Sequence, residues 1–303
     1  MINSYNSIIN LIYRLLSVKG IGNVQTNRLL HLISEKSDIN LAYEEILTYL
    51  DETQRREFAD SSINISLLDN NVKFVSMLDD IYPVELKRGL SVRMPPVLTC
   101  RGNLDLLLMK KIAFSGSRKV SERGMDITRD IIEQLSDSNI CVVSGYAAGV
   151  DFIAHSYTLK NNGYTIIVLP EGINGFSIRK ELISDWNWNR TLVISEFLPN
   201  AKWTAGRAMQ RNKTIIGLSD ISIVIEAGVK GGSFDAGMAT LEQGKYLFVP
   251  QYSVSPESAL GNKILIDRGA FPLRRNRFTN KVNLTMLKKM LNTHNKYSLF
   301  EDW

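Results

Sequence analysis

The chain is poor in cysteine and histidine and contains no long apolar run. Of its 303 residues, two are cysteines and three are histidines. Cys100 and Cys141 lack metal-site spacing, so we expect two reduced structural thiols and no bound metal. No stretch approaches the ~18 consecutive apolar residues of a membrane helix. The N-terminus also lacks the basic region and cleavage site of a signal peptide, which predicts a cytoplasmic protein.

A catalytic constellation is missing as well. Asp151 and His155 lie one helical turn apart, but no nucleophile or metal-ligand set accompanies them. A helix cap beside a packed histidine is therefore favoured over a catalytic pair, and we expect no catalytic residues. The net charge of +5 permits nucleic-acid binding without requiring it.

Hydrophobic periodicity divides the chain into four parts. Residues 1–70 show helical spacing, with Gly20 and Gly22 in a turn between two helices, as in a helix-hairpin-helix. Residues 71–103 contain Pro83, Pro95 and Pro96 and predict an extended connector. Residues 104–277 alternate strands with helices, and residues 278–303 form a polar tail with one weak amphipathic segment, 282–291.

The third part predicts an α/β domain built on a parallel sheet. Its strands are short, β-branched and apolar throughout, as expected when helices cover both faces. The expected strands are 112–114, 140–143, 165–169, 192–194, 221–225 and 246–249. The expected helices are 123–135, 151–160, 179–184, 208–218 and 234–243.

Small and basic residues follow the first of these strands. Gly116, Ser117 and Arg118 form a turn whose backbone N–H groups, helix dipole and arginine suit an anion. The turn is neither G-x-x-x-x-G-K-[ST] nor G-x-G-x-x-G, so neither a nucleoside triphosphate nor NAD is indicated and no cofactor is expected. An ordinary tight turn with a surface arginine is the alternative.

Comparable turns follow the other strands. Carboxyl ends of parallel strands share one edge, so these turns together predict an anion groove. Phe176 is expected either to stack a base or to fold into the core. Besides the first turn, the candidate nucleic-acid-binding residues are Gly145, Gly149, Phe176, Arg179, Lys180, Arg211, Asn212, Lys213, Gly232 and Ser233.

Seven runs in fixed order resemble the DprA/Smf (DNA-processing protein A) family. They are GSR at 116–118, SGYAAGVDFIAH at 144–155, TIIVLPEGIN at 165–174, ISEF at 194–197, RNKTIIGLSD at 211–220, the IEA…GGS run ending at 233, and GNKILIDRGA at 261–270. The resemblance implies an extended Rossmann-like domain behind a small helical domain of SAM or helix-hairpin-helix type. It further implies single-stranded DNA binding, a homodimer formed through the sheet domain, and loading of the RecA recombinase during natural transformation.

The same resemblance carries site roles to Arg118, to Arg179 or Lys180, and to the cluster from Arg211 to Lys213. Departures mark a divergent member: Pro170 and Asn174 replace the usual Gly and Asp, and Lys213 replaces the second arginine of RNR. Residues 278–303 are too few for the winged-helix domain of some members.

Three other functions stay open. DprA-like proteins also occur beside toxin or anti-phage genes, so a defence component is one alternative. A LOG-type nucleotide-processing enzyme is another, although GGSFDAGMA lacks the glutamate of the PGGxGTxxE motif. The third is a pure interaction module that binds an operon-encoded toxin or effector.

Overall fold

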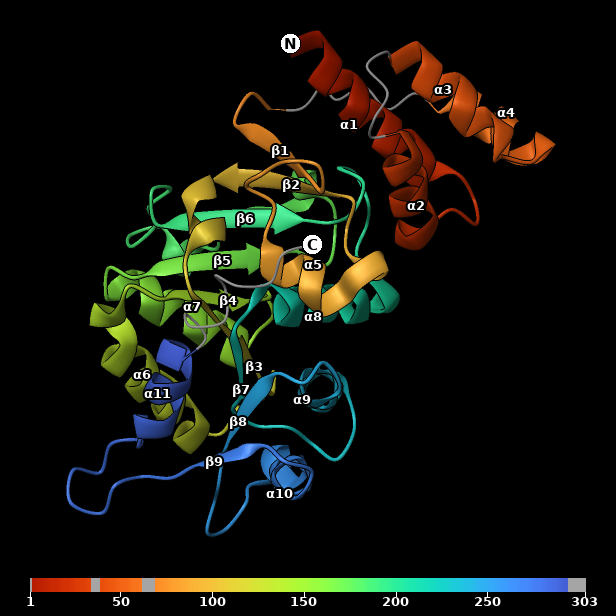
Figure 1. Cartoon of the computed structure of the whole chain (residues 1–303). Coiled ribbons are helices and arrows are strands. Elements are labelled where there is room, and N and C mark those ends of the chain that lie inside the picture. The colour runs from red at the N-terminus through yellow and green to blue at the C-terminus, as the bar shows by residue number, and fades with distance from the viewer. Residues whose placement is uncertain (1, 34–38, 62–68, 294–303) are drawn as a thin grey trace.

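Four helices open the chain and pack on one end of the sheet that follows. The computed structural model describes residues 2–33, 39–61 and 69–293 (Figure 1). Tyr13 is buried and its hydroxyl lies 2.5 Å from Thr99 Oγ1, while its ring meets Phe74 edge-on at 6.0 Å. The first helix, which carries Tyr13, is therefore anchored to the sheet by a polar and an aromatic contact, and the other three pack with it in one apolar cluster. They are α1 (Ile2–Ser17), α2 (Asn23–Ile33), α3 (Ile39–Thr48) and α4 (Glu52–Asp60).

Nine strands form one sheet in the order β1-β2-β6-β5-β4-β3-β7-β8-β9. Every pair from β6 to β9 is parallel, whereas β1 pairs antiparallel with β2, and β2 antiparallel with β6. The α/β class and the parallel sheet expected from the sequence are confirmed. The strands are β1 (Val72–Ser76), β2 (Val97–Gly102), β3 (Lys111–Ser115), β4 (Cys141–Ser144), β5 (Tyr164–Val168), β6 (Thr191–Ser195), β7 (Ile221–Val224), β8 (Tyr246–Pro250) and β9 (Phe271–Leu273).

Segment 71–103 is not the irregular connector that its prolines suggest. It contributes β1 and β2 to the sheet and the helix α5 (Val84–Leu90) to one face. Pro83 sits at the N-cap of α5, where its missing N–H removes no helical bond. A proline restricts the backbone conformation of the residue before it but not of the residues after it, so a helix can begin directly after Pro83.

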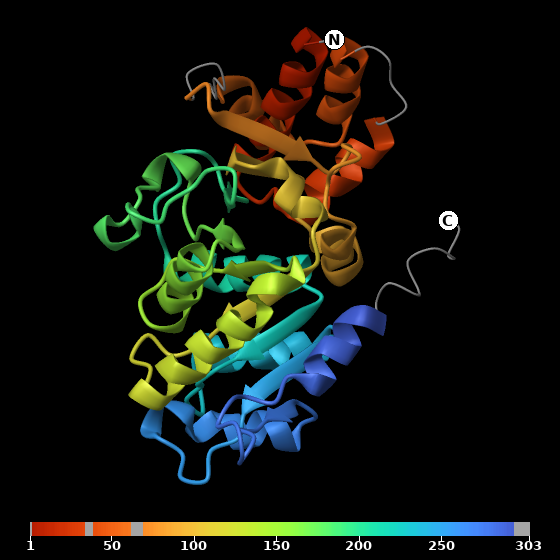
Figure 2. The same cartoon turned by 90° about the vertical axis from the view of Figure 1, so that its left-hand side faces the viewer.

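Helices cover both faces of the sheet (Figures 1 and 2). Residues of α6, α7 and α11 share one apolar cluster with β3, β4 and β7, and residues of α5 and α8 share another with β2, β5 and β6. A third cluster joins α9 and α10 to β7 and β8. These helices are α6 (Glu122–Leu135), α7 (Val150–Lys160), α8 (Ala205–Leu218), α9 (Gly232–Glu242), α10 (Leu260–Asp267) and α11 (Thr285–Thr293).

Part of the expected polar tail belongs to the core. Leu287 and Leu291 of α11 are 0% and 3% exposed, and Lys110 Nζ donates to the Leu291 carbonyl at 3.1 Å. Residues 294–303 of that tail lie outside the described part of the chain. The helix expected at 179–184 is only a 3₁₀ turn, η6. Among the described residues, the 3₁₀ helices are η2 (Ser91–Arg93), η3 (Leu104–Leu108), η4 (Ser136–Ser138), η5 (Ile173–Gly175), η6 (Lys180–Leu182) and η7 (Glu257–Ala259). In the described ranges no helix has the length and apolar character needed to cross a membrane.

Candidate nucleic-acid interface

The strand order reverses at β3. From β3 the chain moves outward through β4 and β5 to β6, and then crosses back through α8 to place β7 on the other side of β3. Loops leaving β3 and β7 therefore diverge at their carboxyl ends. Open α/β sheets bind ligands at such a point. We call the loops at this edge, residues 115–121, 145–149, 169–180 and 225–233, the rim.

Two rim turns interlock at glycines. Gly149 has φ +79°, and a Cβ there would strike the Ser117 carbonyl oxygen. At Gly116 a Cβ would lie 2.9 Å from Val150 Cβ. Val150 N donates to Ser117 O at 3.3 Å and so closes the contact. The predicted grouping of these turns is thus present, with Gly116 and Gly149 acting as spacers that hold the Arg118 turn in place.

Arg211 does not face solvent. Its side chain lies on α8 but turns into the rim, where it is 5% exposed and Nη1 donates to Val168 O at 3.0 Å. Asp151 is 9% exposed and lies close to the Arg211 guanidinium. Both side chains border Gly145, where an added Cβ would meet both Arg211 Nη1 and Asp151 Oδ2. Burial lowers the pKa of Arg211 and raises that of Asp151, while the opposite charge of each opposes both shifts.

His155 completes this buried network. It is fully buried, with Nδ1 2.7 Å from Thr165 Oγ1 and Nε2 hydrogen-bonded to the Gly145 carbonyl. Burial lowers the pKa of His155 to about 4, and the nearby Arg211 acts in the same direction. A neutral histidine with a hydrogen bond at each ring nitrogen supports the packed interpretation. It also positions the backbone at Gly145, against which Arg211 and Asp151 rest. The helix cap expected at Asp151 was wrong, because the N-cap of α7 is Gly149 and Asp151 lies within the first turn.

Phe176 and Arg179 belong to an aromatic cluster. Phe176 is half-buried against Tyr146, Trp186 and Trp188, with ring centroids 5.5, 5.8 and 6.4 Å away. The Arg179 guanidinium lies over the Tyr146 ring at 4.5 Å, and it also donates to the Tyr146 carbonyl. The core interpretation of Phe176 is the better supported one. Arg179 keeps one partly exposed side beside the rim.

Other predicted residues are open to solvent. The side chains of Arg118, Lys180 and Lys213 are exposed. The backbone at Gly232, where α9 begins, is exposed as well. Asn212 is half-buried and its Nδ2 reaches Gly232 O at 3.5 Å. Ser233 is half-buried one residue further on. Arg118 is close enough to the Asp151–Arg211 pair to affect the pKa of both.

Sequence reasoning missed Glu226. This carboxylate is 0% exposed at the end of β7 and accepts four hydrogen bonds. Ser121 donates through its N–H (2.9 Å) and hydroxyl (2.5 Å), Tyr252 through its hydroxyl (3.0 Å) and Ser258 through its hydroxyl (2.6 Å). The signal was an acidic residue inside the apolar run ISIVIEA, because buried charges need partners.

The described residues contain no group of three or more histidine, cysteine or acidic side chains that could hold a metal. Glu226 and Asp151 instead bind neighbouring protein groups. The rim therefore offers exposed cations and the exposed backbone at Gly232 beside buried, hydrogen-bonded polar groups. Such an arrangement suits anions along a surface.

Comparison with known proteins shows the family of the chain. Residues 73–282 match the family model described as DNA recombination-mediator protein A. DNA processing protein DprA of Streptococcus pneumoniae is 34% identical over 196 residues, covering 64% of this chain and 68% of that protein. Protein Smf of Escherichia coli is 28% identical over 264 residues, covering 85% and 70%.

Solved structures share the fold. The X-ray structure of DNA processing protein A from Streptococcus pneumoniae superposes with a TM-score of 0.68 at 28% identity, covering 87% of this chain and 94% of that one. DNA processing protein A from Helicobacter pylori, described with a single-stranded DNA binding mode, gives 0.58 at 24% identity, covering 74% and 96%. At that identity the second likeness concerns the fold alone.

Proposed function

Because this chain belongs to the DNA recombination-mediator protein A family, we propose that it binds single-stranded DNA along the rim and acts in DNA processing and recombination. The observation that carries the proposal is the placement of exposed Arg118 beside the buried Asp151–Arg211 pair. An exposed guanidinium at this edge of the sheet is suited to a phosphate. The sequence relatives named DNA processing protein DprA, 34% and 31% identical, support the DNA-processing part of this assignment.

In this proposal the residues of the rim and of the adjoining helix α8 divide into two roles. Arg118, Lys180 and Lys213 are exposed and contact phosphates, together with the backbone at Gly232 and Ser233. Gly145 and Arg211 hold the turns of the protein in place and do not contact the DNA strand, because the Arg211 guanidinium already donates to Val168 O. Because these contacts involve phosphates, binding is weakly sequence-selective and strongly salt-dependent.

We further propose that the protein works by binding rather than by catalysis. It would act as a homodimer and load a RecA-type recombinase, in natural transformation or other recombination. A defence role with an operon-encoded toxin or effector is the second candidate function. It uses the same rim, so co-purification of an untagged operon partner would favour it.

Fluorescence anisotropy tests the proposal. Labelled single-stranded and duplex oligonucleotides are titrated across a salt series with wild type and Arg118→Ala. We expect a preference for single strands. For each phosphate neutralised, log K should fall by about 0.7 per tenfold rise in salt concentration, and the variant should bind all sequences more weakly. The assignment of the rim as a single-stranded DNA site would be overturned if wild type did not bind single strands, or if Arg118→Ala bound them as tightly as wild type. Release of a free base from nucleoside monophosphates would instead favour the LOG-type enzyme.

A further inference from the structure

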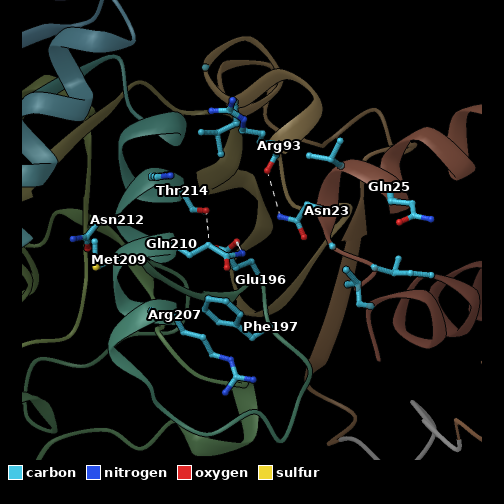
Figure 3. Close-up of a pocket in the computed structure, with 18 of the residues that line it drawn as sticks. Asn23, Gln25, Arg93, Glu196, Phe197, Arg207, Met209, Gln210, Asn212 and Thr214 are labelled. Carbon is cyan, nitrogen blue, oxygen red and sulfur yellow. Dashed lines mark hydrogen bonds between the residues drawn. The ribbon is translucent and has the colours of Figure 1, made fainter. Parts of the chain in front are cut away.

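A groove separates the N-terminal helices from α8 and α9 (Figure 3). Its volume is about 1370 Å³. One wall is formed by α2 with the turn before it and by η2, and the other by α8. Glu196, Phe197 and Leu198, which follow β6, line it between these walls.

Two hydrogen bonds fix the position of the α2 wall. Asn27 Nδ2 donates to Val92 O at 3.1 Å and to Met94 O at 2.8 Å, which fixes α2 against η2. Residues at i, i+4 and i+8 of a helix share one face. The face turned to the groove carries Val24, Arg28 and Leu32, so an arginine lies between two exposed apolar side chains.

The α8 wall has a similar alternation. Met209 is 57% exposed, and Gln210 and Lys213 are exposed beside it. Arg207 is held at the rim end, where Nη1 donates to Lys202 O at 2.5 Å and the guanidinium lies 5.8 Å from the centre of the Phe197 ring. Cations and apolar side chains thus face each other across the groove. Surfaces that bind single strands combine a positively charged groove with side chains that contact the bases.

The charges in the groove favour an anion. Within the described ranges Arg28, Arg93 and Lys213 form no ion pair. The acidic residues that line the groove are Glu196, Asp235 and Glu242. Glu196 is 4% exposed and already accepts from Thr214 (2.6 Å) and Gln210 (2.7 Å), whereas Asp235 and Glu242 are exposed on α9. The three acidic residues are outnumbered by the four cations of the lining, Arg28, Arg93, Arg207 and Lys213.

The groove and the rim are joined through α8. Arg211 of this helix points into the rim, Asn212 reaches the start of α9, and Lys213 lines the groove. From Gly206 to Ile216, α8 runs about 15 Å at 1.5 Å per residue. A strand leaving the rim would therefore meet a continuous path long enough for a few nucleotides.

We propose that this groove is a second binding segment for single-stranded DNA, which receives the strand beyond the rim. The inference rests on the proposed function. Arg28, Arg93, Arg207 and Lys213 contact phosphates, and Val24, Leu32 and Met209 contact bases. An acidic amphipathic peptide would suit the same spacing, but only a nucleic-acid strand is also accommodated by the adjoining rim.

Oligonucleotide length separates the two segments. Wild type, Arg28→Ala/Arg93→Ala and Arg118→Ala are titrated with oligothymidylates of about 6 and about 25 nucleotides, within and beyond one site size. We expect the double variant to bind the long strand about tenfold more weakly with a shallower salt slope, and the short strand like wild type. Arg118→Ala should weaken both. Arg56→Ala/Arg129→Ala removes two arginines outside the groove and should bind like wild type.

A labelled variant reports the strand directly. Cys100 and Cys141 are fully buried, and burial raises the pKa of both thiols, so Val24→Cys can be labelled selectively with an environment-sensitive dye. The signal should change with the long strand only. The groove inference would be overturned if the dye signal did not change with the long strand and the double variant bound both lengths like wild type. An acidic amphipathic peptide would then be the better candidate ligand for the groove. If wild type binds neither length, the proposed function itself has failed.

Discussion

Glu226 accepts both the backbone N–H and the hydroxyl of Ser121, three residues after Arg118. It also accepts from Tyr252 and Ser258, which lie beyond β8. One buried carboxylate therefore joins the loops that leave β3, β7 and β8 at the point where the strand order reverses. The position of Arg118 depends on this junction, although Glu226 itself has no access to solvent.

Glu226→Gln should loosen the junction. All four hydrogen bonds point toward the carboxylate, and an amide group offers one oxygen in place of two and turns an NH₂ toward a donor. Leaving buried groups unpaired costs about 1–3 kcal/mol, which urea unfolding would measure. Oligonucleotide affinity should fall because the Arg118 turn is less fixed. Ser258→Ala removes one bond and should have a smaller effect; equal effects would contradict the shared-junction argument.

Gly145→Ala tests the buried pair at the other side of the rim. The new methyl group would meet Asp151 Oδ2 at 2.5 Å and also strike Arg211 Nη1. Overpacking of this kind costs about 1–3 kcal/mol and should displace Arg211 from Val168 O, lowering both the unfolding midpoint and DNA affinity. Gly206→Ala is the control for the unfolding midpoint alone, because nothing lies within 4 Å of its Cβ position. Equal stability of the two variants would show that the rim relaxes freely.

The regular part of this fold was predictable because it is local. Strands such as β7 are short apolar runs, and Gly116 and Gly149 mark turns that need close approach. β1 and β2 were missed, since the antiparallel pairing that makes them strands comes from partners distant in the chain. The segment 282–291 was expected to be weakly amphipathic, but that Leu287 and Leu291 of α11 would join the core cluster of the sheet could not be predicted from it.

The candidate site was only partly predictable for a similar reason. Sequence indicates which residues follow a strand, but not where a long side chain turns. Arg211 was expected beside phosphates, yet it reaches inward to Val168 O. Glu226 drew no attention because its four donors come from segments up to 105 positions apart. Direct DNA contact by each predicted residue stays a prediction.

Phe176→Ala distinguishes packing from base stacking. The ring is half-buried among Tyr146, Trp186 and Trp188, so its removal should cost about 2 kcal/mol or more of stability. The affinity of the folded variant for DNA should change little. Phe278→Ala, at a 99% exposed phenylalanine, should leave stability within about 0.5 kcal/mol. A stable Phe176→Ala protein with much weaker binding would instead favour the stacking role.

His155 should make the protein sensitive to acid. Its folded pKa of about 4 lies below the ordinary value of 6.5, so between these values the unfolded chain binds the proton that the native state excludes. Stability is therefore fully present above pH 6.5 and is lost as pH falls toward 4, by about 1.4 kcal/mol per pH unit. Asp151, whose pKa burial raises, acts in the opposite sense and reduces the net loss.

Urea unfolding of wild type and His155→Gln between pH 7.5 and 4.5 isolates the histidine. The glutamine can still pair with Thr165 and the Gly145 carbonyl but takes up no proton in this range. The stability difference between the two proteins should therefore shrink, or reverse in favour of the variant, as the pH falls. Parallel curves would mean that His155 protonates equally in the folded and unfolded states, and that the network around Gly145 is more open than its burial indicates.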